Sequence, residues 1–302
     1  RNGSSNDATF ILPLSATLSG YALSVDWGDE ETTDLPDGTT LNQANMTHTY
    51  ATPGKYTITL YTTQKDRTKV QMPKLSFGEN YRNVNNNPSK LENLVTPLLN
   101  MGTDLSNCFH NCTKLPHVPE RLFENNKEAT DFSYCFSGCD RLYMLEQIPA
   151  GLFENNKKAT DFSGCFSSCS QFSQISEGLF ANNPNVTDFS SCFSSCSRLS
   201  QIPEGLFDNN PNVTNFSDCF SYCYNLKPTA NIFCNEATEK GSRFAGKQMN
   251  FNSCFLYCGR DTDGSGTLPA LWEYTMEPNS YHSSCFNGAN ATNTGDILDG
   301  WK

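Results

Sequence analysis

Residues 189–203 read FSSCFSSCSRLSQIP, and this stretch decides the architecture of most of the chain. Its centre is Cys-Phe-x-x-Cys, with a second Phe three residues before the first Cys and a Leu three residues after the second. The motif recurs at first-Cys spacings of 27, 30, 27, 27 and 35 residues, which is too regular for chance. The six pairs are Cys108/Cys112, Cys135/Cys139, Cys165/Cys169, Cys192/Cys196, Cys219/Cys223 and Cys254/Cys258.

The repeat continues beyond these pairs. Cys285 follows 31 residues after Cys254, with Ala289 in the partner position, whereas Cys234 lies outside the register. A period of about 20 to 50 residues is typical of stacked repeats, and this period fits one coil of a leucine-rich-repeat-type solenoid. One coil cannot bury its own apolar side, so Phe, Leu and Cys must stack on their equivalents in the next coil. We therefore expect about seven coils over residues 94–302, with atypical capping ends.

Two details of the coils follow from the same alignment. Residues 94–107 read as a degenerate first coil, in which Leu105 takes the Phe slot. An Asn pair recurs two residues after each Leu-Phe pair, and its side chains would either form a hydrogen-bonded ladder or lie in solvated turns. The Asn pairs are Asn125/Asn126, Asn155/Asn156, Asn182/Asn183 and Asn209/Asn210.

The first part of the chain follows a different pattern, in which short apolar–polar alternations are separated by Gly and Pro turns. This pattern predicts a small all-β sandwich over residues 1–78. Trp27 and Tyr56 are expected in its core, whereas Asp26 and Asp29 are expected to cap turns. The polar, Asn-rich residues 79–93 then form a linker to the repeats.

Two family resemblances refine this interpretation. The FSSCFSSCSRLSQIP pattern resembles the BspA-type leucine-rich repeats and the related Mycoplasma-type surface-protein repeats over about residues 94–300. The WGD run at residues 27–29 and the HTYATPGKYTI run at residues 48–58 resemble the PKD domain, an Ig-like module, although Glu30 replaces the usual Gly. The first resemblance implies a secreted or lipid-anchored protein of anaerobic gut or oral bacteria, Bacteroides-type, with a role in adhesion. Because the chain opens on Arg1, we interpret it as a form from which an export signal, and any lipid anchor, was removed.

The 14 Cys residues allow three interpretations. Local disulfides between residues i and i+4 would be strained in a helical turn, and zinc sites prefer the narrower Cys-x-x-Cys spacing. Free thiols, packed as small hydrophobic groups, need no special geometry and are the favoured alternative. His110 and His117 flank Cys112 as the one candidate Cys/His cluster, and we expect them at variable surface positions.

Residues 261–267, DTDGSGT, resemble the start of a calcium loop. The side-chain oxygens of Asp261, Asp263 and Ser265 would stand at loop positions 1, 3 and 5. Position 12 holds Trp272 instead of the bidentate Glu, so an Asp-Gly-rich turn is the favoured interpretation. We expect no metal and no other cofactor.

Composition limits the function. The chain has 32 acidic and 21 basic residues, a net charge of −11, which argues against nucleic acid or an anionic membrane as a partner. No apolar run is long enough to span a membrane, and no nucleophile elbow, P-loop or zinc-protease motif predicts an enzyme. We expect a monomeric, extracellular or cell-surface protein that binds a host or bacterial surface protein or a glycan.

Two alternatives belong to different classes, namely a structural stalk or assembly subunit without a ligand, and a carbohydrate-binding module. The residue before each first Cys varies between repeats and is expected to be exposed, as at Tyr134, Gly164, Ser191, Asp218 and Ser253. The aromatic candidates for the ligand face are Tyr134, Tyr222, Tyr224 and Tyr257.

Overall fold

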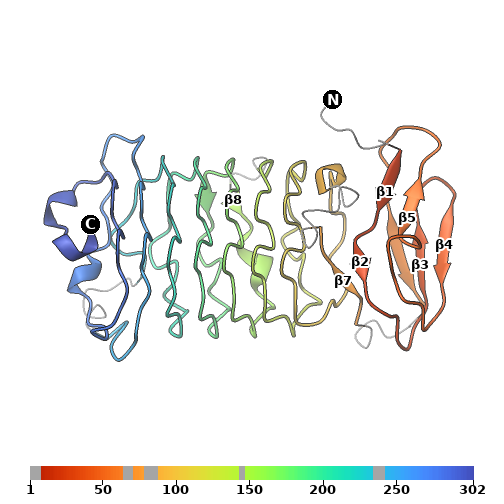
Figure 1. Cartoon of the computed structure of the whole chain (residues 1–302), viewed down its shortest axis with the longest axis horizontal. Helices are drawn as coiled ribbons and strands as arrows, with labels where there is room; N and C mark the ends of the chain where they lie inside the picture. Colours follow the sequence, from red (N-terminus) through yellow and green to blue (C-terminus); the bar gives the residue numbers. More distant parts are fainter. Residues whose placement is uncertain (1–7, 64–70, 78–87, 143–146, 234–241) are drawn as a thin grey trace.

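The computed structural model describes residues 8–63, 71–77, 88–142, 147–233 and 242–302. The molecule is elongated, with the N-terminal strands at one end and the repeats following one another toward the C-terminus at the other (Figure 1). Within these described ranges, no helix combines the length and the apolar character needed to cross a membrane. Cys234 and residues 79–87 of the expected linker lie outside the described residues.

The N-terminal region is a β domain built from short antiparallel pairs. In its described part, β1 pairs with β5, β2 pairs with β7, and β3 lies between β4 and β6. Leu23 and Val25 of β3 are buried, because alternate residues of a strand face the same side. The predicted β-rich domain is confirmed with Trp27 in its core, whereas Tyr56 is only half-buried. The strands are β1 (Thr9–Ile11), β2 (Leu14–Ser15), β3 (Leu23–Asp26), β4 (Thr32–Leu35), β5 (Thr47–Thr49), β6 (Thr59–Thr62) and β7 (Lys74–Leu75).

Successive repeats lie side by side and pair in parallel. One row of bridges joins the residues four positions before each first Cys, from Asp104 through Asp131 and onward to Tyr281. A second row joins β8 (Gln147–Ile148) to β9 (Gln174–Ile175). Equivalent positions of neighbouring repeats therefore lie next to each other along the long axis. The 3-10 helices are η2 (Pro88–Lys90), η3 (Ala150–Phe153), η5 (Leu271–Glu273), η6 (Thr294–Asp296) and η7 (Asp299–Trp301).

Phenylalanine rings form three columns through the repeats. In the column that follows each first Cys, the rings of Phe136, Phe166 and Phe193 stack with centroids 5.5 and 5.7 Å apart. The ring three residues before each first Cys and the ring of each Leu-Phe pair stack in the same way. These rings are fully buried, and each contributes about 1.5–3 kcal/mol by its removal from water. The other two columns contain Phe132, Phe162, Phe189, Phe216 and Phe251, and Phe123, Phe153, Phe180, Phe207 and Phe233.

Each repeat makes two tight turns around its Cys-Phe pair. The N–H of Cys135 donates to the carbonyl of Phe132 at 3.1 Å, and Tyr134, the third residue of that turn, has φ +53°. This is the geometry of a type II turn, which needs a left-handed residue at its third position. The residue before every Cys slot is left-handed throughout the repeats. We call these rows the first turn column (Asn107, Tyr134, Gly164, Ser191, Asp218, Ser253, Ser284) and the second turn column (Asn111, Gly138, Ser168, Ser195, Tyr222, Tyr257, Gly288).

The thirteen described cysteines are buried free thiols in two adjacent columns. The thiol of the second Cys in a repeat donates to a Phe carbonyl of the preceding repeat, as Cys169 does to Phe136 at 3.0 Å. Burial raises the pKa of Cys169 and of Cys223 to about 12. These groups therefore stay protonated at neutral pH and pack as small apolar side chains.

The second Asn of each pair forms a buried ladder. The side-chain amide of Asn183 donates to the carbonyls of Asn156 and Phe153 at 2.9 and 3.1 Å. Asn156 and Asn210 make the equivalent bonds, whereas Asn182, the first Asn of its pair, is exposed. Of the two interpretations left open by the sequence, the ladder holds for the second Asn and the turn for the first.

The last strand of the β domain also begins the repeat stack. The N–H of Phe77 donates to the carbonyl of Cys108 at 3.1 Å, as the N–H of Phe109 does to Cys135 at 2.7 Å. The ring of Phe77 stacks on that of Phe109 at 6.4 Å. Phe77 thus occupies the Phe slot of an additional rung, and Ser76 occupies its Cys slot.

Charged contacts reinforce this junction. The ammonium group of Lys74 lies 2.9 Å from the carboxylate of Asp104. Glu92 joins Lys55 of the β domain, at 2.7 Å, to Lys114 of the first repeat, at 3.7 Å. Leu105 is fully buried in the Phe slot of the first repeat, as predicted. One buried apolar cluster therefore continues from the β domain through the repeats.

Trp301 covers the far end of the stack. Its carbonyl accepts a hydrogen bond from the N–H of Phe286 at 3.1 Å, and the two rings lie 6.1 Å apart. Its indole also stacks on the imidazole of His282 at 4.2 Å. The C-terminal segment thus closes the last repeat, as expected of a terminal cap.

Candidate binding surface

Three tyrosines from two neighbouring repeats meet at one place on the surface. Tyr222 and Tyr257 occupy the second turn column, and their ring centroids lie 5.7 Å apart. Tyr224 approaches Tyr222 edge-on at 6.1 Å. Tyr222 and Tyr257 are each 36% exposed, so the group presents aromatic surface to solvent. We call Tyr222, Tyr224 and Tyr257 the tyrosine cluster.

Arg260 completes the cluster and was not predicted from the sequence. Its guanidinium carbon lies 4.1 Å from the centroid of the Tyr224 ring, a cation–π contact. Its Nε donates to the Asp261 carboxylate at 3.1 Å, while the N–H of Asp261 donates to the Tyr224 carbonyl at 2.9 Å. The positive charge is therefore balanced locally, and Tyr224 is held from two sides.

Tyr134, the fourth predicted aromatic residue, lies in the first turn column three repeats away and does not join the cluster. Its ring occupies the space above Gly164, where a Cβ would come within 2.4 Å of Tyr134 Cε1. Gly164 is consequently buried, so its predicted exposure is wrong. Tyr134 itself is exposed, whereas Ser191, Asp218 and Ser253 in the same column are half-buried, and burial raises the pKa of the Asp218 carboxyl.

The residues of the calcium-like loop are already paired with cations of the chain. Asp263 lies 3.1 Å from Lys227, and bonds from Ser265 and Lys227 lower the pKa of Asp263 to about 2. Asp261 contacts Arg260, and Ser265 donates its N–H to Asp263. Trp272 lies in η5, a short 3-10 helix. The loop is a turn of the Asp-Gly type in this structure.

The Cys/His candidates separate into different environments. His110 is buried, which contradicts its predicted surface position, and burial lowers its pKa. His117 is half-buried, and Cys112 belongs to the thiol columns. Across the described ranges, no group of three or more His, Cys, Asp or Glu side chains is arranged to hold a metal ion.

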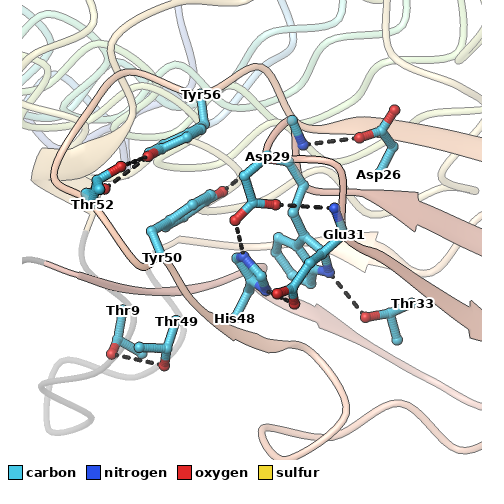
Figure 2. Close-up of polar contacts among 12 residues, drawn as sticks. Thr9, Asp26, Asp29, Glu31, Thr33, His48, Thr49, Tyr50, Thr52 and Tyr56 are labelled. Atoms are coloured by element: carbon cyan, nitrogen blue, oxygen red, sulfur yellow. Dashed lines mark hydrogen bonds and ion pairs between the residues drawn. The ribbon is translucent and has the colours of Figure 1, made fainter.

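The β domain contains a polar network around His48 (Figure 2). The imidazole Nε2 lies 2.7 Å from the Asp29 carboxylate, and the ring stacks on Trp27 at 4.9 Å. The hydrogen bond with His48 is the main cause that lowers the pKa of Asp29. Asp29 also accepts the N–H of Glu31, and Asp26 accepts that of Gly28, so both predicted turn caps are present. The pair with His48 was missed, because its residues stand 19 positions apart.

A shallow cleft of about 180 Å³ lies at the C-terminal cap. Trp272, Tyr274 and Trp301 contribute aromatic surface, and Glu277 and His282 contribute polar groups. Because His282 and Trp301 stack on each other, this cleft is part of the packing that closes the last repeat.

Comparison with known proteins identifies one part of the chain. Residues 6–72 match the family model of the PKD domain. This match covers the WGD and HTY motifs and the strands that precede β7. None of the curated proteins compared with the chain matches it.

Proposed function

We propose that the chain is a non-enzymatic, extracellular binding protein in which residues 94–302 form a leucine-rich-repeat solenoid of the BspA type. The period of the Cys-Phe motif, the parallel rungs between repeats and the one-residue-per-repeat Phe columns support this proposal. The buried Asn and Cys columns also fit, because leucine-rich repeats place Asn or Cys at one inward position of each unit.

The PKD domain supports a place outside the cytoplasm, because such domains occur in extracellular proteins. It stands at one end of the repeat stack (Figure 1). A binding surface on the repeats would then be presented away from this domain. We propose attachment to a host or bacterial surface as the role of the whole chain.

The tyrosine cluster is the observation that carries the binding role. It gathers exposed aromatic rings on a surface whose turn columns otherwise hold Ser, Asp, Asn, Gly and the isolated Tyr134. Aromatic residues and Arg are enriched where proteins bind partners. A catalytic role for the cysteines is disfavoured, because buried thiols with raised pKa values are poor nucleophiles.

The test combines binding with mass. The purified chain is passed over immobilised matrix proteins and polysaccharides, and its mass is measured by light scattering across a range of concentrations. Saturable binding by a monomer supports the proposal. Absence of binding, together with a mass that rises with concentration, would instead support the structural stalk or assembly subunit.

A further inference from the structure

We propose that the tyrosine cluster is a carbohydrate site that takes the flat C–H face of a pyranose ring from a neutral glycan. The inference rests on the proposed binding function and assigns the ligand class. Its parts are the rings of Tyr222 and Tyr257, with Tyr224 and Arg260 at the side.

Tyr222 and Tyr257 stand, like Tyr134 of the first turn column, at positions whose backbone disfavours an aromatic residue. Tyr222 and Tyr257 have φ +59° and +55°, in the left-handed region that Gly, Asn and Asp adopt most easily. Other repeats place Asn, Gly or Ser at the same position. A bulky aromatic residue there is strained, and each of the two tyrosines still keeps 36% of its surface exposed to solvent. Strain of this kind is typical of functional positions.

The shape of the surface fits a sugar ring. A Cβ placed on Gly288 would lie 2.3 Å from Tyr257 Cδ1, so the Tyr257 ring lies over the glycine of the next repeat. The exposed part of Tyr222 and Tyr257 is the area that a ligand can contact. The two neighbouring rings, 5.7 Å apart and tilted by 39°, give a shallow platform. The C–H groups of a pyranose face carry partial positive charge and stack on the negative face of an aromatic ring.

The surroundings favour a glycan over a protein partner. Near the platform the turn columns hold Ser195, Asp218 and Ser253, whose small polar groups suit sugar hydroxyls. Other large exposed apolar side chains on the described repeats are few, namely Val95, Tyr134, Tyr281 and Leu298. A protein interface would need an apolar core with a polar rim around it.

The charges favour a neutral glycan. The net charge of −11 repels polyanions such as uronic acid polymers. Arg260, the cation at the cluster, is paired with Asp261 and lies over Tyr224. Recognition therefore depends on stacking and on hydrogen bonds rather than on ion pairing.

The test uses the whole chain in native gels that contain laminarin, soluble starch, xyloglucan or galactomannan, with polygalacturonate as the anionic comparison. The variants are Tyr222→Ser and Tyr257→Ser, alone and combined, because Ser168 and Ser195 hold the same column position with the same sign of φ. Tyr222→Phe keeps the ring. Tyr61→Ser, at an exposed strand position of the PKD domain, is the matched control. Circular dichroism and retained thiol burial verify that each variant is folded.

We expect retardation by at least one neutral polysaccharide, and a Kd about tenfold or more weaker for each Tyr→Ser variant. Tyr222→Phe and Tyr61→Ser should bind like the unchanged protein. Retardation that survives in the double variant, or retardation only by polygalacturonate, overturns the inference. Binding to fibronectin or laminin with no polysaccharide binding also overturns it, while the proposed function stands. Absence of binding to every probe overturns both the glycan site and the proposed binding function.

Discussion

Phe77 should stabilise the first repeat against local unfolding. The Phe77→Ala substitution removes a ring that is only 5% exposed and stacks on Phe109 at the head of the ring column. Buried Phe→Ala changes destabilise proteins by about 3–5 kcal/mol. Rings inside the column, such as Phe193, have a stacked neighbour on both sides, whereas Phe77 lies at the end. We therefore expect the lower end of that range, about 3 kcal/mol.

The stability lost in the Phe77→Ala variant should first affect the neighbouring repeat and only then the whole stack. In a linear stack each repeat contacts only its neighbours, so the end that loses its cover opens first. Hydrogen–deuterium exchange with mass spectrometry measures this opening peptide by peptide. A loss of about 3 kcal/mol corresponds to exchange about a hundredfold faster around residues 105–112, with a smaller change around residues 249–258.

The control is Phe10→Ala, which removes a half-buried ring of β1 that packs in the same domain. It should loosen the PKD domain with less effect on residues 105–112. If Phe77→Ala leaves exchange in the first repeat unchanged, Phe77 does not cap the stack. An equal increase in every repeat would show that the stack opens as a single unit and would refute the local argument.

Four further results are expected. Ser195→Gly should stabilise the chain by up to about 1 kcal/mol in urea denaturation and Ser195→Val should destabilise it by about 1–2, because the position is left-handed. Asn183→Ala should cost about 2–3 kcal/mol, since two buried hydrogen bonds are lost, whereas exposed Asn182→Ala should stay within about 0.5 kcal/mol. Because His48 lowers the pKa of Asp29, the contribution of this pair to the stability of the PKD domain is fully present above about pH 4 and is lost as pH drops through that lowered pKa; Asp29→Asn should flatten this acid dependence in thermal scans. The thirteen buried thiols should not react with Ellman's reagent at pH 8 until the protein is unfolded; fast labelling of any of these thirteen in the native chain would contradict their burial.

The Phe, Cys and Leu columns could be predicted from the sequence, whereas the junction between the β domain and the first repeat could not. A fixed slot for Phe, Cys and Leu in every repeat is enough to align those slots, because parallel neighbours place equal positions side by side. Phe77 escaped this reasoning, since Ser76 stands in its Cys slot and the neighbouring β7 pairs with β2 of the N-terminal β domain. A two-residue Ser-Phe match outside the periodic region is too short a signal to recognise.

Surface positions were harder to predict than core positions. The side chain of Tyr134 reaches over the next repeat, so Gly164 is buried although it shares a slot with half-exposed residues. Likewise Tyr222 and Tyr257 are 35 residues apart, and only the stacking of their repeats brings the rings together. Arg260 lies outside the periodic motif, and its contact with Tyr224 depends on the turn that follows Cys258.

The turn columns show how this surface accommodates large side chains. Asn111, Tyr134 and Tyr257 each lie over a glycine of the next repeat, and a Cβ on those glycines would come within 2.2–2.4 Å of them. Tyr134 and Tyr257 therefore each have a glycine beside them in the direction of the C-terminus, and this rule holds for the rings only, since the smaller Asn107 is followed by Tyr134. Tyr222 breaks this rule, because the next residue in its column is Tyr257 rather than glycine. Its ring cannot lie over bare backbone and instead packs against two other tyrosines, so the one exception to the rule is also the place where aromatic rings accumulate. Packing alone would favour glycine or serine at both positions, and a ligand that stacks on the rings would explain why tyrosine stands there.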